Sequence, residues 1–122
     1  MEQLRVLSPE LVESSPVAAA AQQWILDHQP HGSPSVLLHG DLLPQNILVS
    51  CEWPEGSVGV LDWEFAKIGD PAYDLAIVTR GARNPLKVTH GLDRLLARYS
   101  EFSGSDVPVD AVRVYELLLH LN

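Results

Sequence analysis

The sequence has little cysteine and little positive charge. Cys51 is the only cysteine, so no internal disulfide can form, which favours a reducing compartment. No Lys, Arg or His adjoins it in sequence, so we expect a buried, unreactive thiol. Lys and Arg number 8 against 16 Asp and Glu, giving a formal net charge of −8. Because nucleic-acid phosphates require clustered basic side chains, this balance argues against a nucleic-acid partner.

Long apolar runs are also missing. The chain starts Met-Glu-Gln-Leu-Arg, without a basic segment leading into an apolar one, so no signal peptide is predicted. No apolar run approaches the roughly 18 residues needed to span a bilayer. We therefore expect a cytoplasmic protein that does not bind membranes. With 46% hydrophobic and 20% charged residues, the 122-residue chain has the composition of one modest globular domain.

The apolar periodicity predicts an α+β chain. Residues 1–15 show little periodicity and are interpreted as an N-terminal extension, so the domain is predicted over residues 16–122. Helices are expected over residues 17–28, 70–80, 86–102 and 109–121. Strands are expected over residues 36–39, 47–51 and 58–62, the first of them buried on both faces. Residues 52–57 should join the last two strands as a hairpin, and residues 67–69 should form a turn.

Polar side chains cluster at the ends of two of these apolar runs. Asp41 and Asn46 stand five residues apart around Pro44, and Asp62 ends the run that begins at Val58. If the two runs pair as a hairpin, two carboxylates and an amide oxygen meet at one rim. Taken singly, each of these residues would more often be a turn or cap residue. Together they indicate a functional site.

Three motifs in this order resemble a known family. His-Gly-Asp at residues 39–41, Asn46, and then Asp-Trp-Glu at residues 62–64 resemble the catalytic loop and metal-binding aspartate of the protein-kinase superfamily. The later run Gly-Asp-Pro-Ala-Tyr-Asp-Leu-Ala at residues 69–76 narrows the resemblance to the aminoglycoside phosphotransferases and their choline-kinase-like relatives. It covers about residues 16–122. It implies the C-terminal lobe of a kinase-like fold, mainly helical, with a short β-hairpin carrying the catalytic loop.

The resemblance implies a role for each matching residue. Asp41 would be the base, because a hydroxyl nucleophile needs a nearby carboxylate to orient it and accept its proton. Asn46 and Asp62 would bind Mg²⁺, which prefers oxygen ligands and usually keeps waters beside the phosphates of ATP. The residues implied to support the loop are His39 and Asp74, and those implied to contact ATP are Leu48 and Leu61. Asp70 before Pro71 is better explained as a helix N-cap.

Part of the family's pattern is missing. No Gly-rich loop precedes residue 39, and no Val-Ala-x-Lys strand supplies a phosphate-binding lysine. Lys67 and Lys87 both follow Asp62, and Leu43 stands where many relatives carry His or Lys. We therefore expect that the N-terminal lobe is absent and that the isolated chain binds nucleotide poorly and turns over negligibly. We also expect the bare lobe interface to favour a homo-oligomer or another partner.

The favoured interpretation is an ATP- and Mg²⁺-dependent phosphotransferase lobe acting on a hydroxyl of a small molecule. The excess of acidic residues would suit a cationic substrate. A noncatalytic kinase-like module for binding or oligomerisation is the first alternative, although decay should have removed Asp41 or Asp62. A metal-dependent hydrolase using His39 and these carboxylates is the second, but no other histidine lies at metal-ligand spacing.

Overall fold

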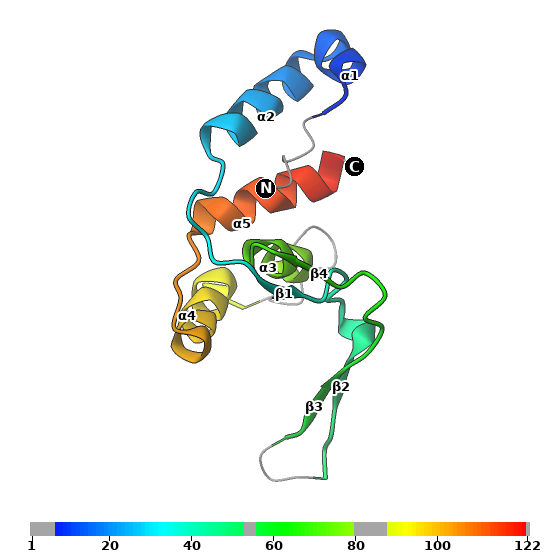
Figure 1. Cartoon of the computed structure of the whole chain (residues 1–122), viewed down its shortest axis with the longest axis vertical. Helices are drawn as coiled ribbons and strands as arrows, with labels where there is room; N and C mark the ends of the chain where they lie inside the picture. The colour runs from blue at the N-terminus through cyan, green and yellow to red at the C-terminus, as the bar shows by residue number, and fades with distance from the viewer. Residues whose placement is uncertain (1–6, 53–55, 80–87, 122) are drawn as a thin grey trace.

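The computed structural model describes residues 7–52, 56–79 and 88–121, and within them the chain is an α+β fold. Figure 1 shows the helices arranged along the long axis, with a β-hairpin projecting from the far end. The elements are α1 (Pro9–Ser14), α2 (Pro16–Asp27), β1 (Val36–Leu38), the 3₁₀ turn η1 (Pro44–Asn46), β2 (Ile47–Val49), β3 (Val58–Val60), β4 (Lys67–Gly69), α3 (Ala72–Thr79), α4 (Gly91–Ser103) and α5 (Val109–Leu121).

The first two helices each begin at a Ser-Pro pair. Ser15 caps α2, accepting the N–H of Ala18 at 3.3 Å, and the proline that follows it fits the first helical position. The helix therefore begins at Pro16, one residue before the predicted residue 17. Ser8 caps α1 in the same way. The periodicity did not predict α1, because this six-residue helix buries none of its side chains.

The apolar core lies where α5 packs against its neighbours. Ala72 and Ala76 of α3 and Val112 of α5 are fully buried in one cluster, which Leu96 of α4 joins. A second cluster on α5 packs against Ile25 of α2. Helix α5 is therefore covered on two sides, and the apolar stripes predicted along α4 and α5 are confirmed. None of the described helices combines the length and apolarity needed to cross a lipid bilayer.

Helix α3 starts with the predicted N-cap, whereas α4 starts later than predicted. Asp70 accepts the N–H of Ala72 at 2.8 Å, as expected of an N-cap. Helix α4 begins at Gly91, after His90 in a left-handed conformation, and therefore later than the predicted residue 86. The predicted end of α3, at residue 80, lies outside the described residues.

Strands β1 and β4 pair antiparallel, with Leu37 opposite Ile68. The prediction of a turn at residues 67–69 is therefore wrong: a three-residue strand is too short to show a period, and its partner lies about thirty residues earlier in the sequence. The prediction that the first strand is buried on both faces is also wrong. Leu37 is 64% and Ile68 67% exposed, because this two-stranded sheet is covered on one face only.

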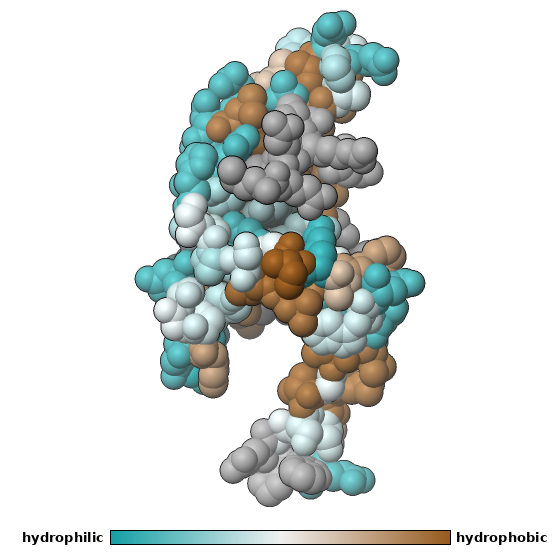
Figure 2. All heavy atoms as spheres, in the orientation of Figure 1, coloured by the Kyte–Doolittle hydropathy of each residue, from teal (hydrophilic) through white to brown (hydrophobic). Residues whose placement is uncertain are grey.

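Strands β2 and β3 form the predicted hairpin, with Ile47 opposite Val60. Both strands are shorter than predicted, although Ser50 N–H still donates to the Ser57 carbonyl at 2.9 Å. The hairpin projects from the helices (Figures 1 and 2), and its apolar residues Leu48, Val49 and Val58 stay exposed. Cys51 just beyond β2 is exposed too, which corrects the prediction of a buried thiol. Nothing in the described structure packs over this end of the ribbon.

Candidate active site

His39 joins the two segments that carry the polar cluster. It follows β1 directly and is only 3% exposed. Its Nε2–H donates to the Leu61 carbonyl at 2.7 Å, and its Nδ1 accepts the backbone N–H of Asp41 at 3.2 Å. Because a carbonyl can only accept and an amide N–H can only donate, these partners fix the neutral Nε2–H tautomer. Both ring nitrogens are engaged, so His39 orients the cluster and leaves no nitrogen to ligate a metal.

Asp74 holds the same loop onto α3. Its carboxylate accepts the backbone N–H of His39 at 2.7 Å and that of Gly40 at 2.9 Å. Gly40 has φ +85°, and a Cβ there would lie 2.2 Å from the carbonyl oxygen of Phe65. Only glycine can adopt this conformation and this close approach without displacing its neighbours. The backbone of residues 39–41 is thus fixed between α3 and the segment that follows Asp62.

The carboxamide of Asn46 is hydrogen-bonded to Asp41. Pro44 opens the short 3₁₀ turn η1, and Asn46 at its end is 8% exposed. The Asn46 Nδ2 donates to the Asp41 carbonyl at 2.9 Å and to Asp41 Oδ2 at 3.3 Å. Because the nitrogen is committed to these acceptors, the amide oxygen Oδ1 is the atom that can bind a cation. Leu43, between them, is buried at 5% exposure and presents no polar group.

Asp62 follows Leu61, which is hydrogen-bonded to Asn46 just beyond the end of β3. The Leu61 N–H donates to the Asn46 carbonyl at 2.8 Å, which continues the register of Ile47 opposite Val60 by one residue. Residues opposite each other in such a ladder lie about 5 Å apart at Cα. Asp62 is therefore the immediate neighbour of the residue opposite Asn46. The structure brings residues 41, 46 and 62 to one end of the hairpin; their chemical roles stay predictions.

The backbone at Asp62 is unusual. Its φ is +65°, and among the described residues only His90 shares a positive φ without being glycine. Residues with a Cβ disfavour this left-handed region, although Asp and Asn tolerate it better than most. Asp62 lies in the segment between β3 and β4, and this left-handed residue is exposed to solvent.

The donor set suits Mg²⁺. Two carboxylates and one amide oxygen are hard ligands of the kind that Mg²⁺ takes, usually beside waters and phosphate oxygens. Within residues 7–52, 56–79 and 88–121, no three His, Cys, Asp or Glu gather closely enough to hold a metal ion. A complete cage from the protein is therefore not present in this part of the chain. Asn46 and Asp62 would hold the ion, with the remaining ligands supplied by water and by a phosphate-bearing substrate.

The residues implied to contact ATP are accessible. Leu48 is 54% and Leu61 49% exposed, both on the hairpin that carries the polar cluster. Lys67, the one lysine in the described residues, places its Nζ 3.8 Å from the centre of the Tyr73 ring. It is thus engaged in a cation–π contact with α3. Lys87 lies outside the described residues.

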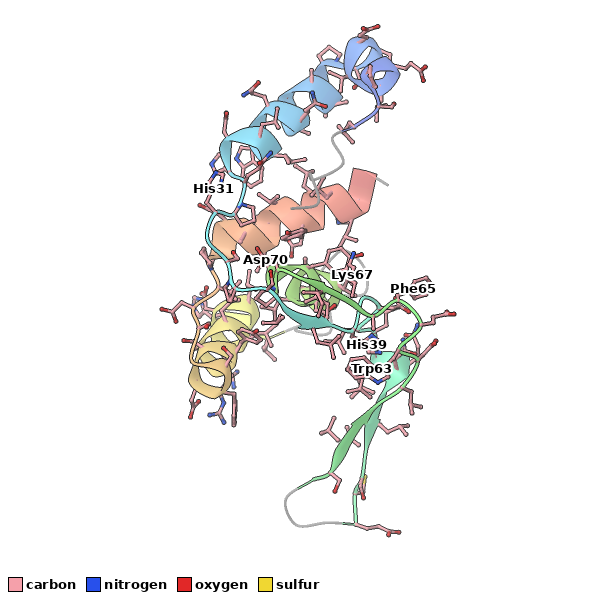
Figure 3. All side chains as sticks on the ribbon, in the orientation of Figure 1. His31, His39, Trp63, Phe65, Lys67 and Asp70 are labelled. Atoms are coloured by element: carbon pink, nitrogen blue, oxygen red, sulfur yellow. The ribbon has the colours of Figure 1, made fainter. Side chains whose placement is uncertain are left out.

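Sequence reasoning gave Trp63 no role of its own. Its Nε1–H donates to the Val60 carbonyl at 2.9 Å, and its ring meets that of His39 edge-on with centroids 4.8 Å apart. Figure 3 shows the two rings together at the base of the hairpin, with Phe65 beyond them. The position of an indole N–H directly after a candidate metal ligand was the signal that could have identified it.

The chain is similar to known phosphotransferases in sequence pattern and in fold. The profile of the Phosphotransferase enzyme family matches residues 2–113. The crystal structure of an aminoglycoside-3'-phosphotransferase of type VIII superposes with a TM-score of 0.62 at 20% identity, covering 98% of this chain and 44% of that one. This likeness shows the fold: the chain matches a fragment of the phosphotransferase fold.

Two curated proteins match shorter stretches. The mouse acyl-CoA dehydrogenase family member 10 is 36% identical over 63 residues, which is 52% of this chain and 6% of that protein. The protein YcbJ of Bacillus subtilis (strain 168) is 42% identical over 57 residues, 46% of this chain and 18% of YcbJ. The chain thus matches less than a fifth of the length of either curated relative.

Proposed function

Since this chain belongs to the phosphotransferase enzyme family, we propose that it is the part of an ATP- and Mg²⁺-dependent phosphotransferase that carries the base and the metal ligands. The reaction is transfer of the γ-phosphoryl group of ATP to a hydroxyl of a small molecule. The proposal rests on the hydrogen bonds that join Asp41 to Asn46 and Asn46 to Leu61. These bonds connect a carboxylate, an amide and the neighbour of a second carboxylate.

Asp41 is the base. Its carboxylate orients the acceptor hydroxyl and takes the proton as the new oxygen–phosphorus bond forms and the bond to the ADP leaving group breaks. Asn46 donates to one carboxylate oxygen, Oδ2, at 3.3 Å and so limits the rotation of the Asp41 side chain. Proton transfer to a base positioned in this way contributes about 10²–10⁴-fold to rate. His39 and Asp74 keep the loop in place by hydrogen bonds to its backbone.

Asn46 and Asp62 hold Mg²⁺. The bound ion would supply neutralisation of the phosphate charge. The chain's own part is to present the amide oxygen of Asn46 and a carboxylate oxygen of Asp62, the residue after Leu61, which is hydrogen-bonded to Asn46. Leu48 and Leu61 offer exposed apolar surface at the same end, suited to contact with the nucleotide.

The charge distribution supports a cationic acceptor. Residues 6–66 contain eight Asp and Glu and no Lys or Arg, so this stretch accounts for the chain's net charge of −8. It includes both candidate catalytic carboxylates. A negative field of this kind raises the local concentration of a positively charged substrate. An aminated hydroxyl compound is therefore the proposed acceptor class, and a reducing, cytoplasmic setting fits the single unpaired Cys51.

We expect the isolated chain to bind nucleotide weakly and to be nearly inactive. It spans 44% of the related solved phosphotransferase, and its one described lysine is engaged with Tyr73. An assay with Mg-ATP and a panel of aminoglycosides and amino alcohols should detect negligible turnover. Turnover that Asp41→Ala abolishes would contradict this expectation while supporting the assignment of the base.

The metal ligands can be tested without turnover. Paramagnetic Mn²⁺ should broaden the amide NMR signals of residues 41–46 and 61–63 in the wild-type chain, because the ion binds among them. Asp62→Asn should remove most of this broadening. Asp93→Asn, which changes an exposed aspartate on α4, is the matched control and should leave it intact. Equal broadening in the two variants would refute the proposed metal site.

One observation favours a second property, self-association. Leu48, Val49 and Val58 are 54%, 64% and 64% exposed on a two-stranded ribbon that nothing in the described structure covers (Figure 2). Ribbons of two strands are marginal in water, and their edges pair readily with another strand. We propose that two copies pair through this hairpin. Light scattering should show a dimer that Val58→Lys converts to monomer; a wild-type monomer at all concentrations would contradict the pairing.

A further inference from the structure

We propose that Trp63 is a positioning residue that holds Asp62 in its metal-binding conformation. The inference rests on the proposed function, because it assigns Trp63 a task only if Asp62 binds the divalent cation. It adds a residue to the site that the resemblance did not assign.

The first observation is a hydrogen bond that spans Asp62. The indole Nε1–H of Trp63 donates to the carbonyl of Val60 at 2.9 Å, across the residue with φ +65°. The Ala66 N–H then donates to the Trp63 carbonyl at 3.0 Å. The left-handed residue Asp62 is therefore bridged by the Trp63 side chain, while the Trp63 backbone begins the next turn, at residues 63–66. Without such a bridge, a residue with a Cβ leaves the left-handed region readily.

The second observation is the contact with His39. The two rings meet edge-on at 4.8 Å, while His39 Nε2 donates to the Leu61 carbonyl at 2.7 Å. The carbonyls of Val60 and Leu61, the last two before Asp62, thus accept from two side chains that also touch each other. This arrangement couples the direction of the Asp62 peptide to the loop that carries Asp41 (Figure 3).

The third observation is that burial does not explain Trp63. Its residue is 48% exposed and belongs to neither apolar cluster of the core. A phenylalanine would supply a similar ring face against His39 but no N–H for Val60. If the hydrogen bond is what fixes Asp62, then Trp63→Phe must weaken metal binding even though the fold of the helices stays unchanged.

The experiment measures Mn²⁺ affinity from the broadening of amide signals in four variants of the full 122-residue chain. Trp63→Phe should weaken Mn²⁺ binding about tenfold, the lower end of the effect of losing an outer hydrogen-bond partner of a metal ligand. Trp24→Phe makes the same change in α2, away from the site, and should leave the affinity at the wild-type value. The amide signals of α3 and α5 should stay unshifted in Trp63→Phe.

A double-mutant cycle separates positioning from general destabilisation. In an Asp62→Asn background, Trp63→Phe should cause no further loss of Mn²⁺ affinity, because the ligand it positions is gone. The inference is overturned if Trp63→Phe binds Mn²⁺ as tightly as wild type, if it weakens binding equally in both backgrounds, or if it shifts α3 and α5 throughout. Failure of the wild-type chain to bind Mn²⁺ at residues 41–46 and 61–63 would instead refute the proposed function.

Discussion

The helices and the hairpin region are stabilised by different forces. In the helical part, Ala72, Ala76 and Val112 are fully buried and apolar contacts hold α3, α4 and α5 together. Between residues 39 and 66, several large apolar side chains, including Phe65 at 58%, remain exposed. There the backbone is fixed by polar contacts of buried His39 and Asn46 and by a glycine. Single polar changes should therefore open the site while the helices stay folded.

Gly40→Ala should have the largest effect on the stability of the hairpin region. A Cβ at residue 40 meets the Phe65 carbonyl at 2.2 Å, and the left-handed φ adds strain. We expect the free energy of opening residues 39–66 to fall by about 3 kcal/mol, measured by native-state hydrogen exchange. Gly32→Ala is the matched control. Gly32 has φ +73°, but no atom lies within 4 Å of the added Cβ, so the local stability should fall by only about 1 kcal/mol. Equal effects at the two glycines would show that φ alone, and not the close approach, matters.

A smaller effect is expected from Asp74→Ala. Two backbone N–H groups lose a charged acceptor at 2.7 and 2.9 Å, so the opening free energy at residues 39–41 should fall by about 2 kcal/mol. Asp93→Ala removes a carboxylate from the equivalent first turn of α4, where it is exposed, and should cost at most about 0.5 kcal/mol. Hydrogen exchange at Gly40 reports the result. Unchanged protection there would show that the loop does not depend on α3.

The smallest effect should appear in the helical part, as a dependence on pH. Burial, with a contribution from the negative charge of Asp70, raises the pKa of Tyr115 on α5 from 10.0 to about 12. The folded state then keeps a proton that the unfolded state loses. Stability is therefore full below pH 10.0 and falls as pH rises toward about 12.

The change should be about 1 kcal/mol, because Tyr115 is only partly buried and solvent screens the effect. Urea unfolding at several pH values measures it, with Tyr115→Phe as the comparison. The phenylalanine variant should lose this decline in the free energy of unfolding. A decline that persists undiminished in Tyr115→Phe would assign it to other groups.

The sequence predicted the helices and the hairpin better than the remaining strands. Apolar spacing along α4 and α5 and the Ser-Pro start of α2 have local physical causes, so they could be recognised. The pairing of β1 with β4 depends on a partner distant in sequence, and the exposure of Cys51 depends on how far the hairpin projects. Neither feature can be predicted from a local sequence pattern.

The candidate site was found from motif order, but its internal contacts were not. The spacing of Asp41, Asn46 and Asp62 predicted that they share one rim, and the register of the hairpin agrees with that. The left-handed backbone at Asp62 and the hydrogen bond of Trp63 could not be foreseen, because both depend on where β3 ends. Residue types indicated the proposed chemistry, while the structure shows where the backbone places those residues.

The most direct measurement is a residue-resolved Mn²⁺ titration of the wild-type chain that follows the Asn46 side-chain amide together with the backbone amides of Asp41 and Asp62. If the three residues surround one ion, all three signals should broaden along a single binding curve, and Asp62→Asn should shift all three together. Broadening at Asp62 that leaves the Asn46 side chain unaffected, or separate curves for the two, would contradict a shared cation site.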